Sequence, residues 1–251
     1  MIQLEELAVP KMKRVERMTA TMRTIHWTNA LCMVVAVATG LYIGHPYYQT
    51  FIADPAVDKY IMAWNRWGHF IAAIIFDVTA ILIGYLYLFS NFDKPYKKIL
   101  PTKKNFIEFW EVFFNLMTFN RRKKFDSTHS DSYNIVFFTF FHILLVFMLL
   151  TGLQLYVHGL ASGESSIGSW WPWMLHFATD WTLSVFGGNM GVRIAHHTAM
   201  YLIIMWVMTH IYYQIWRTIF WREGDIGIVF SGHKFVKDED ETKEDTNKVK
   251  K

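Results

Sequence analysis

The sequence predicts an all-α membrane protein, a bundle of four transmembrane helices accompanied by interfacial helices. Two observations predict this class. The 251-residue chain is 53% hydrophobic and 18% aromatic, and its apolar residues gather in runs too long for an ordinary soluble domain. Four of these runs are each long enough to cross a hydrocarbon core of about 30 Å. They cover about residues 25–45, 67–90, 133–157 and 194–217.

The distribution of positive charge predicts the orientation of the chain. The net charge of +4 would also suit a nucleic-acid-binding protein, but its distribution indicates a membrane topology and no nucleic-acid partner. Lys and Arg are abundant before the first apolar run and in the 91–132 loop, and scarce in the 46–66 and 158–193 loops. Because cytoplasmic loops carry the excess of Lys and Arg, we expect a multi-pass protein of the inner (cytoplasmic) membrane, in contact with its lipids, with both termini cytoplasmic.

The chain reads as one four-helix domain over residues 1–236, followed by a charged tail over residues 237–251 that we expect to be disordered. Two further segments lie outside the four runs. Residues 104–118 are aromatic with polar interruptions and suggest an amphipathic helix on the inner surface. Residues 170–186 suggest an interfacial segment on the outer side, since they are too short and too interrupted for a fifth span.

Histidines in the apolar runs predict two metal sites. His196 and His210 are 14 residues apart, so they leave the same helix face about 21 Å apart along the axis; His197 lies about 140° away, on another face. The topology pairs His69 with His196 on the outer side and His26 with His210 on the cytoplasmic side. Paired imidazoles at two depths are what two stacked b haems require. We therefore predict that these four histidines ligate the iron of two haem b groups.

Three of the predicted ligands follow an arginine by three residues, which places both side chains on one helix face. Each arginine lies one turn nearer water than its histidine, where a haem propionate would point. Charge-assisted pairing with a propionate is one interpretation, and snorkelling to lipid headgroups is the other. The arginines are Arg23, Arg66 and Arg193.

Other residues inside the runs have two interpretations each. Gly40, Gly84 and Gly152 lie near the predicted haem depths, where they would leave room for a flat macrocycle or serve ordinary helix packing. His142 and Asp77 lie at mid-membrane depth. They could hydrogen-bond as a link between helices or form part of a proton path.

Five short motifs mark the ends of the predicted spans and the C-terminal region. They are R-x-x-H-W (23–27), R-x-x-H-F (66–70), T-G-L-x-L-Y (151–156), H-x13-H (196–210) and G-H-K-F (232–235). On these motifs the chain resembles the membrane cytochrome b subunit of nickel–iron uptake hydrogenases, over most of residues 20–236. The four-helix histidine pattern is shared with gamma subunits of formate dehydrogenases, so that branch, or another respiratory oxidoreductase, stays an alternative. The G-H-K-F motif and the G-G-N before the last helix favour the hydrogenase branch, whereas His197 stands where we expect an arginine in that family.

The resemblance implies an electron-transfer and quinone-reducing subunit of a hydrogen:quinone oxidoreductase complex. Electrons would come from the hydrogenase small and large subunits on the periplasmic side, cross from the outer haem to the inner haem and reduce a quinone, with menaquinone expected. The residues agree on one point. With a single cysteine, Cys32, the chain alone cannot hold an iron–sulfur cluster, so its electron donor and acceptor must come from elsewhere.

A quinone site needs polar groups beside an aromatic slot near the inner haem. His129, Tyr133 and Asn134 lie at the expected depth and are our candidates; interfacial anchoring and helix capping are the alternative roles. A different class of protein also remains open at this point. In a haem-free proton or metal transporter, the buried His, Asp and Arg side chains would line the path.

Overall fold

The computed structural model describes residues 12–46, 60–89, 101–120, 122–123, 125, 127–160, 168–221 and 225–237. These residues belong to two compact units. A central unit covers residues 29–211, and a terminal unit combines the chain up to Thr28 with the chain from Tyr212 onward.

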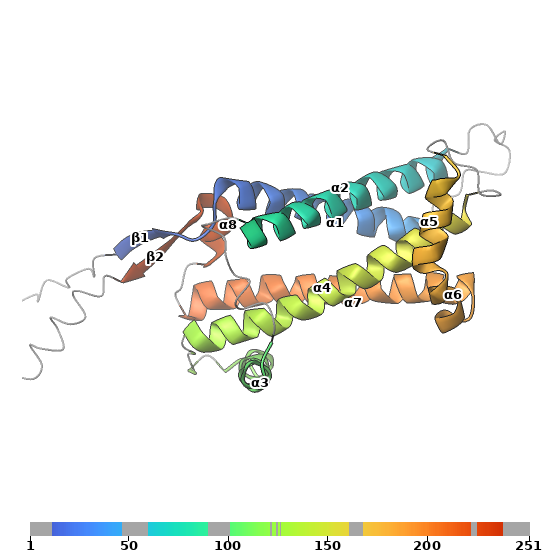
Figure 1. Cartoon of the computed structure of the whole chain (residues 1–251). Helices are drawn as coiled ribbons and strands as arrows, with labels where there is room; N and C mark the ends of the chain where they lie inside the picture. The colour runs from blue at the N-terminus through green and yellow to red at the C-terminus, as the bar shows by residue number, and fades with distance from the viewer. Residues whose placement is uncertain are drawn as a thin grey trace, which may run out of the picture. The chain divides into compact units, whose positions relative to one another are not determined.

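Four helices are long and apolar enough to cross a membrane, and the chain is a multi-pass membrane protein (Figure 1). Their beginnings lie about five residues before the predicted apolar runs, because the first turn of each helix carries polar or interfacial residues that hydropathy does not mark. The first helix ends at Gly44, shortly before Pro46, as proline requires. The helices are α1 (Ala20–Gly44), α2 (Ile61–Phe89), α4 (Ser127–His158) and α7 (Asn189–Trp216).

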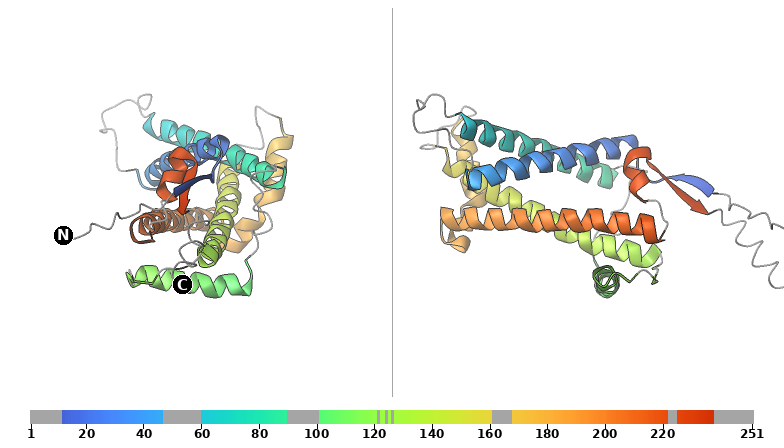
Figure 2. Two further views of the ribbon diagram at one scale, coloured as in Figure 1. Left: turned by 90° about the vertical axis from the view of Figure 1, so that its left-hand side faces the viewer. Right: turned by 180° about the vertical axis from the view of Figure 1, so that it is seen from behind.

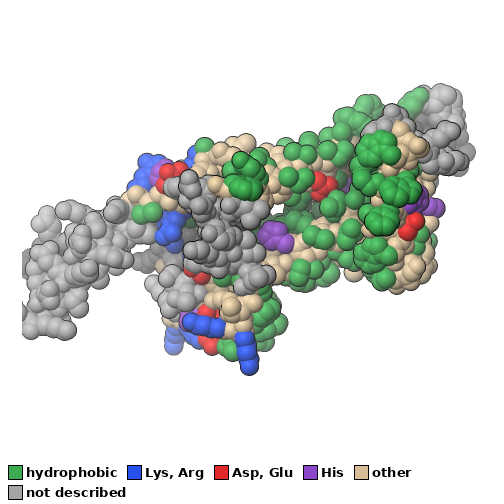
Figure 3. Space-filling view, in the orientation of Figure 1, with side chains coloured by type: hydrophobic (Ala, Val, Ile, Leu, Met, Phe, Trp, Pro, Cys, Tyr) green, Lys and Arg blue, Asp and Glu red, His purple; other side chains and the backbone are tan. Residues whose placement is uncertain are grey.

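Aromatic stacking joins α4 to α7 inside the central unit. The ring of Trp206 lies between two α4 side chains, with centroids 3.9 Å from Phe141 and 4.7 Å from Phe137. Its indole nitrogen donates to the Phe137 carbonyl oxygen at 2.9 Å, so this buried polar atom is satisfied. On the outward faces, by contrast, large apolar side chains such as Ile81 and Met205 are exposed. Figure 3 shows hydrophobic side chains over the described helices, as expected for surfaces that face lipid.

The predicted amphipathic segment is helix α3 (Lys103–Met117), which lies crosswise on α4 in Figures 1 and 2. It begins in a capping box, in which Thr102 and Asn105 bond each other's backbone nitrogens. One face buries Val112 and Leu116 completely. The opposite face exposes aromatic side chains, including Trp110, as an interfacial helix does.

Residues 170–186 form two short helices, α5 (Trp170–Thr179) and α6 (Trp181–Phe186), and not a fifth span. They pack on α4 through a buried pair of side chains, in which the Gln154 amide donates to the Thr179 hydroxyl at 2.7 Å. The hydroxyl hydrogen itself goes to the Leu175 carbonyl, also at 2.7 Å. Helix α6 ends at Gly187 with φ of 74°, a left-handed conformation that glycine adopts without a steric penalty.

The terminal unit contains a two-stranded sheet that the sequence did not suggest. Strand β1 (Met12–Glu16) pairs antiparallel with β2 (His233–Lys237). Three short helical segments precede β2, namely η4 (Arg217–Trp221), η5 (Asp225–Gly227) and α8 (Ile228–Ser231). The tail beyond Lys237, which we expect to be disordered, lies outside the described residues.

Candidate functional site

The predicted outer pair of histidines meets in the central unit. His69 on α2 and His196 on α7 have ring centroids 6.4 Å apart, with an interplanar angle of 63°. Imidazole nitrogens bind first-row metals at about 2 Å, so two imidazoles on opposite sides of one metal atom place their centroids about 6 Å apart. The observed separation fits a single metal atom between the rings.

The hydrogen bonds of the two rings indicate which nitrogen faces that space. His69 bonds through Nδ1 to Thr39 Oγ1 and to the Ala36 carbonyl oxygen, both at 3.0 Å. His196 bonds through Nδ1 to Thr151 Oγ1 at 2.8 Å. A metal-ligating histidine uses its second nitrogen in this way, which fixes the ring and leaves Nε2 for the metal.

Two glycines line these rings. A β-carbon at Gly40 would lie 3.3 Å from Cε1 of His69, and one at Gly152 would lie 3.3 Å from Cε1 of His196. Both separations are tighter than ordinary carbon contacts, so larger residues at these positions would displace the imidazoles. The two glycines therefore lie at the depth of the outer pair, where the sequence predicts them. At Gly84 a β-carbon would meet nothing within 4 Å.

His197 faces a different neighbour from His196. Its ring lies against Gly44 at the end of α1, so closely that a β-carbon there would collide with it. His196 instead meets Thr151 and Gly152 on α4. The two adjacent histidines thus have separate surroundings, as the helical spacing predicts.

The two predicted inner ligands fall in different units, so their pairing stays a prediction. His210, in the central unit, stacks on Trp206 with centroids 5.2 Å apart and an angle of 5°, and meets the edge of Phe138. His26, in the terminal unit, is half-buried. Its Nδ1 has no hydrogen-bond partner among the described residues. An unsatisfied buried nitrogen is unusual in a folded protein and is frequent where a ligand completes the site.

The three arginines that precede predicted ligands differ in their surroundings. Arg66 and Arg193 are exposed, which suits either propionate or headgroup contact. Arg23 lies against Gly232, where a β-carbon would collide with its Nη1 atom. Gly232 belongs to the G-H-K-F motif and has φ of 80°; its carbonyl oxygen accepts from the backbone nitrogen of Arg17 at 2.8 Å. The motif therefore holds the start of α1 in the terminal unit.

An open pocket of about 460 Å³ also lies in the terminal unit. Aromatic side chains from Trp27 and Phe230 line it, with ring centroids 5.2 Å apart, together with the polar side chains of Arg23 and Thr24. Arg23, Thr24 and Trp27 belong to α1, the helix that also carries His26. The pocket could not be predicted from the sequence, because its second wall comes from residues about 200 positions later in the chain.

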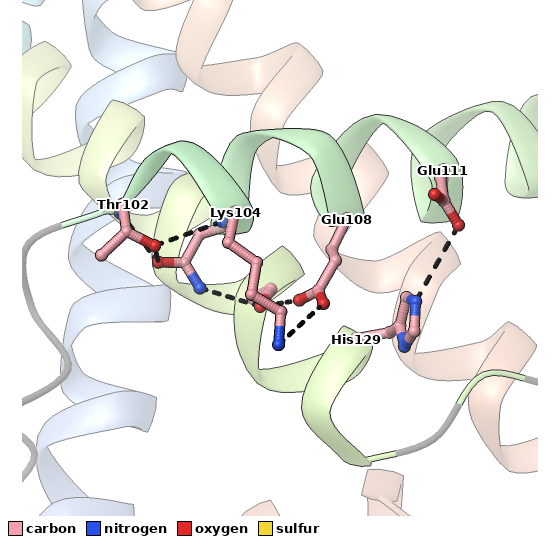
Figure 4. A network of polar contacts seen from close by, with 7 residues as sticks. Thr102, Lys104, Glu108, Glu111 and His129 are labelled. Carbon is pink, nitrogen blue, oxygen red and sulfur yellow. Dashed lines mark hydrogen bonds and ion pairs between the residues drawn. The ribbon is translucent and has the colours of Figure 1, made fainter.

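The candidate quinone residues lie on α4 where it meets α3, and Figure 4 labels one of them, His129. His129 Nε2 is 3.9 Å from Glu111 Oε2. Tyr133 is fully buried, and its ring stacks between Phe109 at 5.1 Å and Phe137 at 5.2 Å. Tyr133 therefore contributes to helix packing here, and Asn134 beside it is half-buried.

Glu108 on α3 is the buried charge of this contact. It accepts a hydrogen bond from Ser132 at 2.5 Å, and its other carboxylate oxygen pairs with Lys104 at 3.4 Å (Figure 4). The Ser132 hydrogen bond, followed by Lys104, lowers the pKa of the Glu108 carboxyl below its usual value. The carboxylate is thus held ionised at the α3–α4 contact.

His142 and Asp77 do not form the hydrogen bond that we considered. His142 is exposed, and its Nδ1 bonds the Phe138 carbonyl of its own helix at 2.6 Å. Among the described residues, no hydrogen bond joins it to Asp77.

Sequence reasoning missed the residues that hold the imidazoles, namely Thr39, Ala36 and Thr151. A signal was present, since Thr39-Gly40-Leu41 in the first helix matches Thr151-Gly152-Leu153 in the third span. A match of three residues is too short to be noticed unless both segments are already known to face a histidine.

This geometry defines a class of protein: a helical membrane protein whose spans hold two imidazoles spaced for one metal. Among the described residues no group of three or more His, Cys, Asp or Glu side chains converges on a metal position. Two imidazoles at this spacing suit a metal atom that takes two ligands from the protein, whereas a structural zinc site takes four. The family model described as prokaryotic cytochrome b561 matches residues 17–232. The chain belongs to this family.

Curated relatives agree with the family. A probable Ni/Fe-hydrogenase B-type cytochrome subunit of Cupriavidus necator is 26% identical over 223 residues, which cover 87% of this chain and 86% of the relative. The protein of the same description from Azotobacter chroococcum mcd 1 is 29% identical, with 88% of each chain covered. A probable Ni/Fe-hydrogenase 1 B-type cytochrome subunit of Escherichia coli K12 is 26% identical, with 87% of this chain and 91% of the relative covered.

Proposed function

We propose that this chain is the membrane cytochrome b subunit of a nickel–iron hydrogenase and transfers electrons from that enzyme to a quinone. The observation that carries the proposal is the His69–His196 pair, whose centroid separation of 6.4 Å fits one iron. The names of the relatives support the partner, since each is described as a B-type cytochrome subunit of a Ni/Fe-hydrogenase.

We propose that the chain holds two haem b groups, the outer one through His69 and His196 and the inner one through His26 and His210, which the sequence pairs. When bound, haem supplies a centre that takes up and releases one electron reversibly. The chain's own residues bind and orient it. Thr39, Ala36 and Thr151 hold the outer imidazoles by their Nδ1 atoms, and Gly40 and Gly152 leave space at these rings.

We place the His69 end of the bundle on the periplasmic side and both termini in the cytoplasm. The excess of Lys and Arg before the first span and in the 91–132 loop supports this orientation. The hydrogenase subunits would then contact the side that carries α5 and α6, and protons for quinone reduction would come from the cytoplasm. The acceptor we propose is menaquinone.

Two places on the predicted cytoplasmic side could hold the quinone. One is the α3–α4 contact with His129, Tyr133 and Asn134. The other is the open pocket lined by Trp27 and Phe230, because a quinone site needs an aromatic-lined slot with a few polar groups. Phe230→Ala and Tyr133→Phe, each checked for normal haem content, separate them: the variant that raises the KM for quinone with hydrogen as donor marks the site.

A reduced-minus-oxidised spectrum with a haem-to-protein ratio on the purified chain tests the central proposal. We expect two b haems per chain in the wild type and one in His196→Ala. A chain without haem would contradict the proposal and favour a transporter. Co-purification then tests the partner. If formate dehydrogenase subunits copurify in place of hydrogenase subunits, the chain is the cytochrome b subunit of a formate dehydrogenase.

A further inference from the structure

In the central unit, two helices each hold a histidine of the span that follows them with a threonine and the adjacent glycine. On α1, Thr39 and Gly40 meet His69 of the following span α2. On α4, Thr151 and Gly152 meet His196 of the following span α7. The glycine distances are equal at 3.3 Å, and the threonine distances are 3.0 and 2.8 Å.

The chemistry of the threonine hydroxyls decides how they act on the rings. A hydroxyl has one hydrogen to donate. Thr39 donates it to the Val35 carbonyl at 2.6 Å, and Thr151 donates it to the Phe147 carbonyl at 2.8 Å. A hydroxyl that donates to its own helix acts as an acceptor toward the histidine, and the hydrogen of that contact then comes from Nδ1. For His69 the Ala36 carbonyl, which can only accept, also requires a hydrogen on Nδ1. In this arrangement both rings leave the Nε2 lone pair free.

We infer that Thr39 and Thr151 are paired positioning residues that orient His69 and His196 as axial ligands and tune the potential of the iron between them. This inference rests on the proposed ligation by these two histidines. An acceptor on Nδ1–H makes the imidazole a stronger donor to a metal. A stronger donor stabilises the ferric form, so each hydroxyl lowers the reduction potential of the outer haem.

The two sides are not equally protected against loss of the hydroxyl. His69 has a second acceptor, the Ala36 carbonyl at 3.0 Å, which no side-chain substitution removes. His196 has Thr151 as its one hydrogen-bond partner among the described residues. Removing the Thr151 hydroxyl leaves that Nδ1–H unpaired, whereas removing the Thr39 hydroxyl leaves the other ring still bonded. Thr151 therefore has the larger influence.

The experiment compares Thr151→Val, Thr39→Val and Thr151→Ser in the full-length detergent-purified chain. Valine keeps the shape of threonine and removes the acceptor, while serine keeps the acceptor. Thr198→Val is the matched control, since Thr198 is exposed on α7 and bonds the Ile194 carbonyl of its own helix. Haem content, potentiometric titration and the electron paramagnetic resonance spectrum of the ferric form are measured for each.

We expect Thr151→Val to move the midpoint potential of one haem to a more positive value and to change one ferric signal. Thr39→Val should cause a smaller shift of the same sign. Thr151→Ser should restore the wild-type values, and Thr198→Val should not differ from the wild type. Loss of haem in Thr151→Val that Thr151→Ser restores would equally support the role of the hydroxyl.

Wild-type potential and spectrum in a fully loaded Thr151→Val protein would overturn the inference, as would equal haem loss in the valine and serine variants. A larger shift in Thr39→Val than in Thr151→Val would overturn the asymmetry. These results are distinguishable from failure of the proposed ligation, which would appear as retention of both haems in His196→Ala.

Discussion

At the scale of the residue, the adjacent side chains of His196 and His197 have different surroundings. Helical periodicity separates His196 from His197, because a 100° step per residue changes the face. The structure indeed gives them different neighbours, Gly152 and Gly44. Thr39 and Thr151 were not predictable as supports, because a threonine inside a span usually bonds its own helix. Both do so here, and their second role depends on which helix lies opposite.

The small size of Gly152 should be required for the outer site. In Gly152→Val, the β-carbon would lie 3.3 Å from His196 Cε1 and the added methyl groups nearer still. Overpacking of this kind costs about 1–3 kcal/mol, so we expect His196 to be displaced and one haem to be lost from the spectrum. Ala80→Val, on an exposed face of α2, is the control. Full haem content in both variants would show that the space between Gly152 and His196 accommodates a larger side chain.

Gly232 should be needed for its left-handed backbone. Gly232→Ala would place a β-carbon at φ of 80°, in collision with Arg23 and 2.6 Å from the Met18 carbonyl oxygen. We expect a loss of about 1–3 kcal/mol of stability in the terminal unit, seen as faster proteolysis near the N-terminus. Gly227→Ala is the matched control, since it has φ of −61° and no atom within 4 Å of its β-carbon. Equal proteolysis of the two variants would contradict the prediction.

At the scale of the element, the long helices follow from hydropathy and the sheet does not. Each span is a local pattern of apolar residues that can be read in one window. The β1–β2 pair joins Arg14 to Phe235, and pairing across that separation leaves no local periodic pattern in five-residue strands. Helix α3 lies between these cases. Its amphipathic pattern was visible, but the buried Glu108 on its packed face was not.

The attachment of α3 to α4 should weaken in acid. The pKa of Glu108 is lowered in the folded protein from its ordinary value of 4.5, chiefly by the Ser132 hydrogen bond. A lowered folded pKa means that the carboxylate contributes stability above about pH 4.5, and that this contribution is lost as the pH falls through the folded pKa. The protection factors of the α3 amides, which compare exchange with the intrinsic rate at the same pH, should therefore fall below pH 4.5. Ser132→Ala should bring this loss of protection to higher pH and cost about 1 kcal/mol.

A variant at an exposed position provides the comparison for this effect. Lys103 is exposed on the same helix, so Lys103→Gln should leave the protection factors of α3 close to those of the wild type at every pH. Protection factors of α3 that do not fall in acid in the wild type would refute the stabilising role of the Glu108 carboxylate.

At the scale of the whole molecule, composition alone predicts a four-span membrane protein, and the family confirms this class. The orientation of the chain in the membrane rests on the Lys and Arg counts of the loops. Helix packing does not depend on these charges and so does not report the orientation. The assignment of one side of the membrane to electron entry and the other to quinone reduction therefore stays a proposal.

The predicted orientation can be tested with single cysteines in a Cys32→Ala background. Cys32 is the single cysteine of the sequence and is buried. Replacing it with alanine leaves the introduced cysteine as the one thiol that can react. A membrane-impermeant maleimide should label Ser184→Cys on α6 in intact spheroplasts, and Lys103→Cys on α3 only after lysis. Both positions are exposed, so the difference reports the side of the membrane. The reverse pattern would invert the topology.

The placement of His196 and His210 on α7 has a consequence for biogenesis. This helix carries one proposed ligand for each haem, and it follows the other three described spans in the chain. Neither cofactor would then gain its second histidine before α7 is synthesised. Haem loading would follow the synthesis of α7, and a nascent chain arrested before α7 would present each site with one ligand.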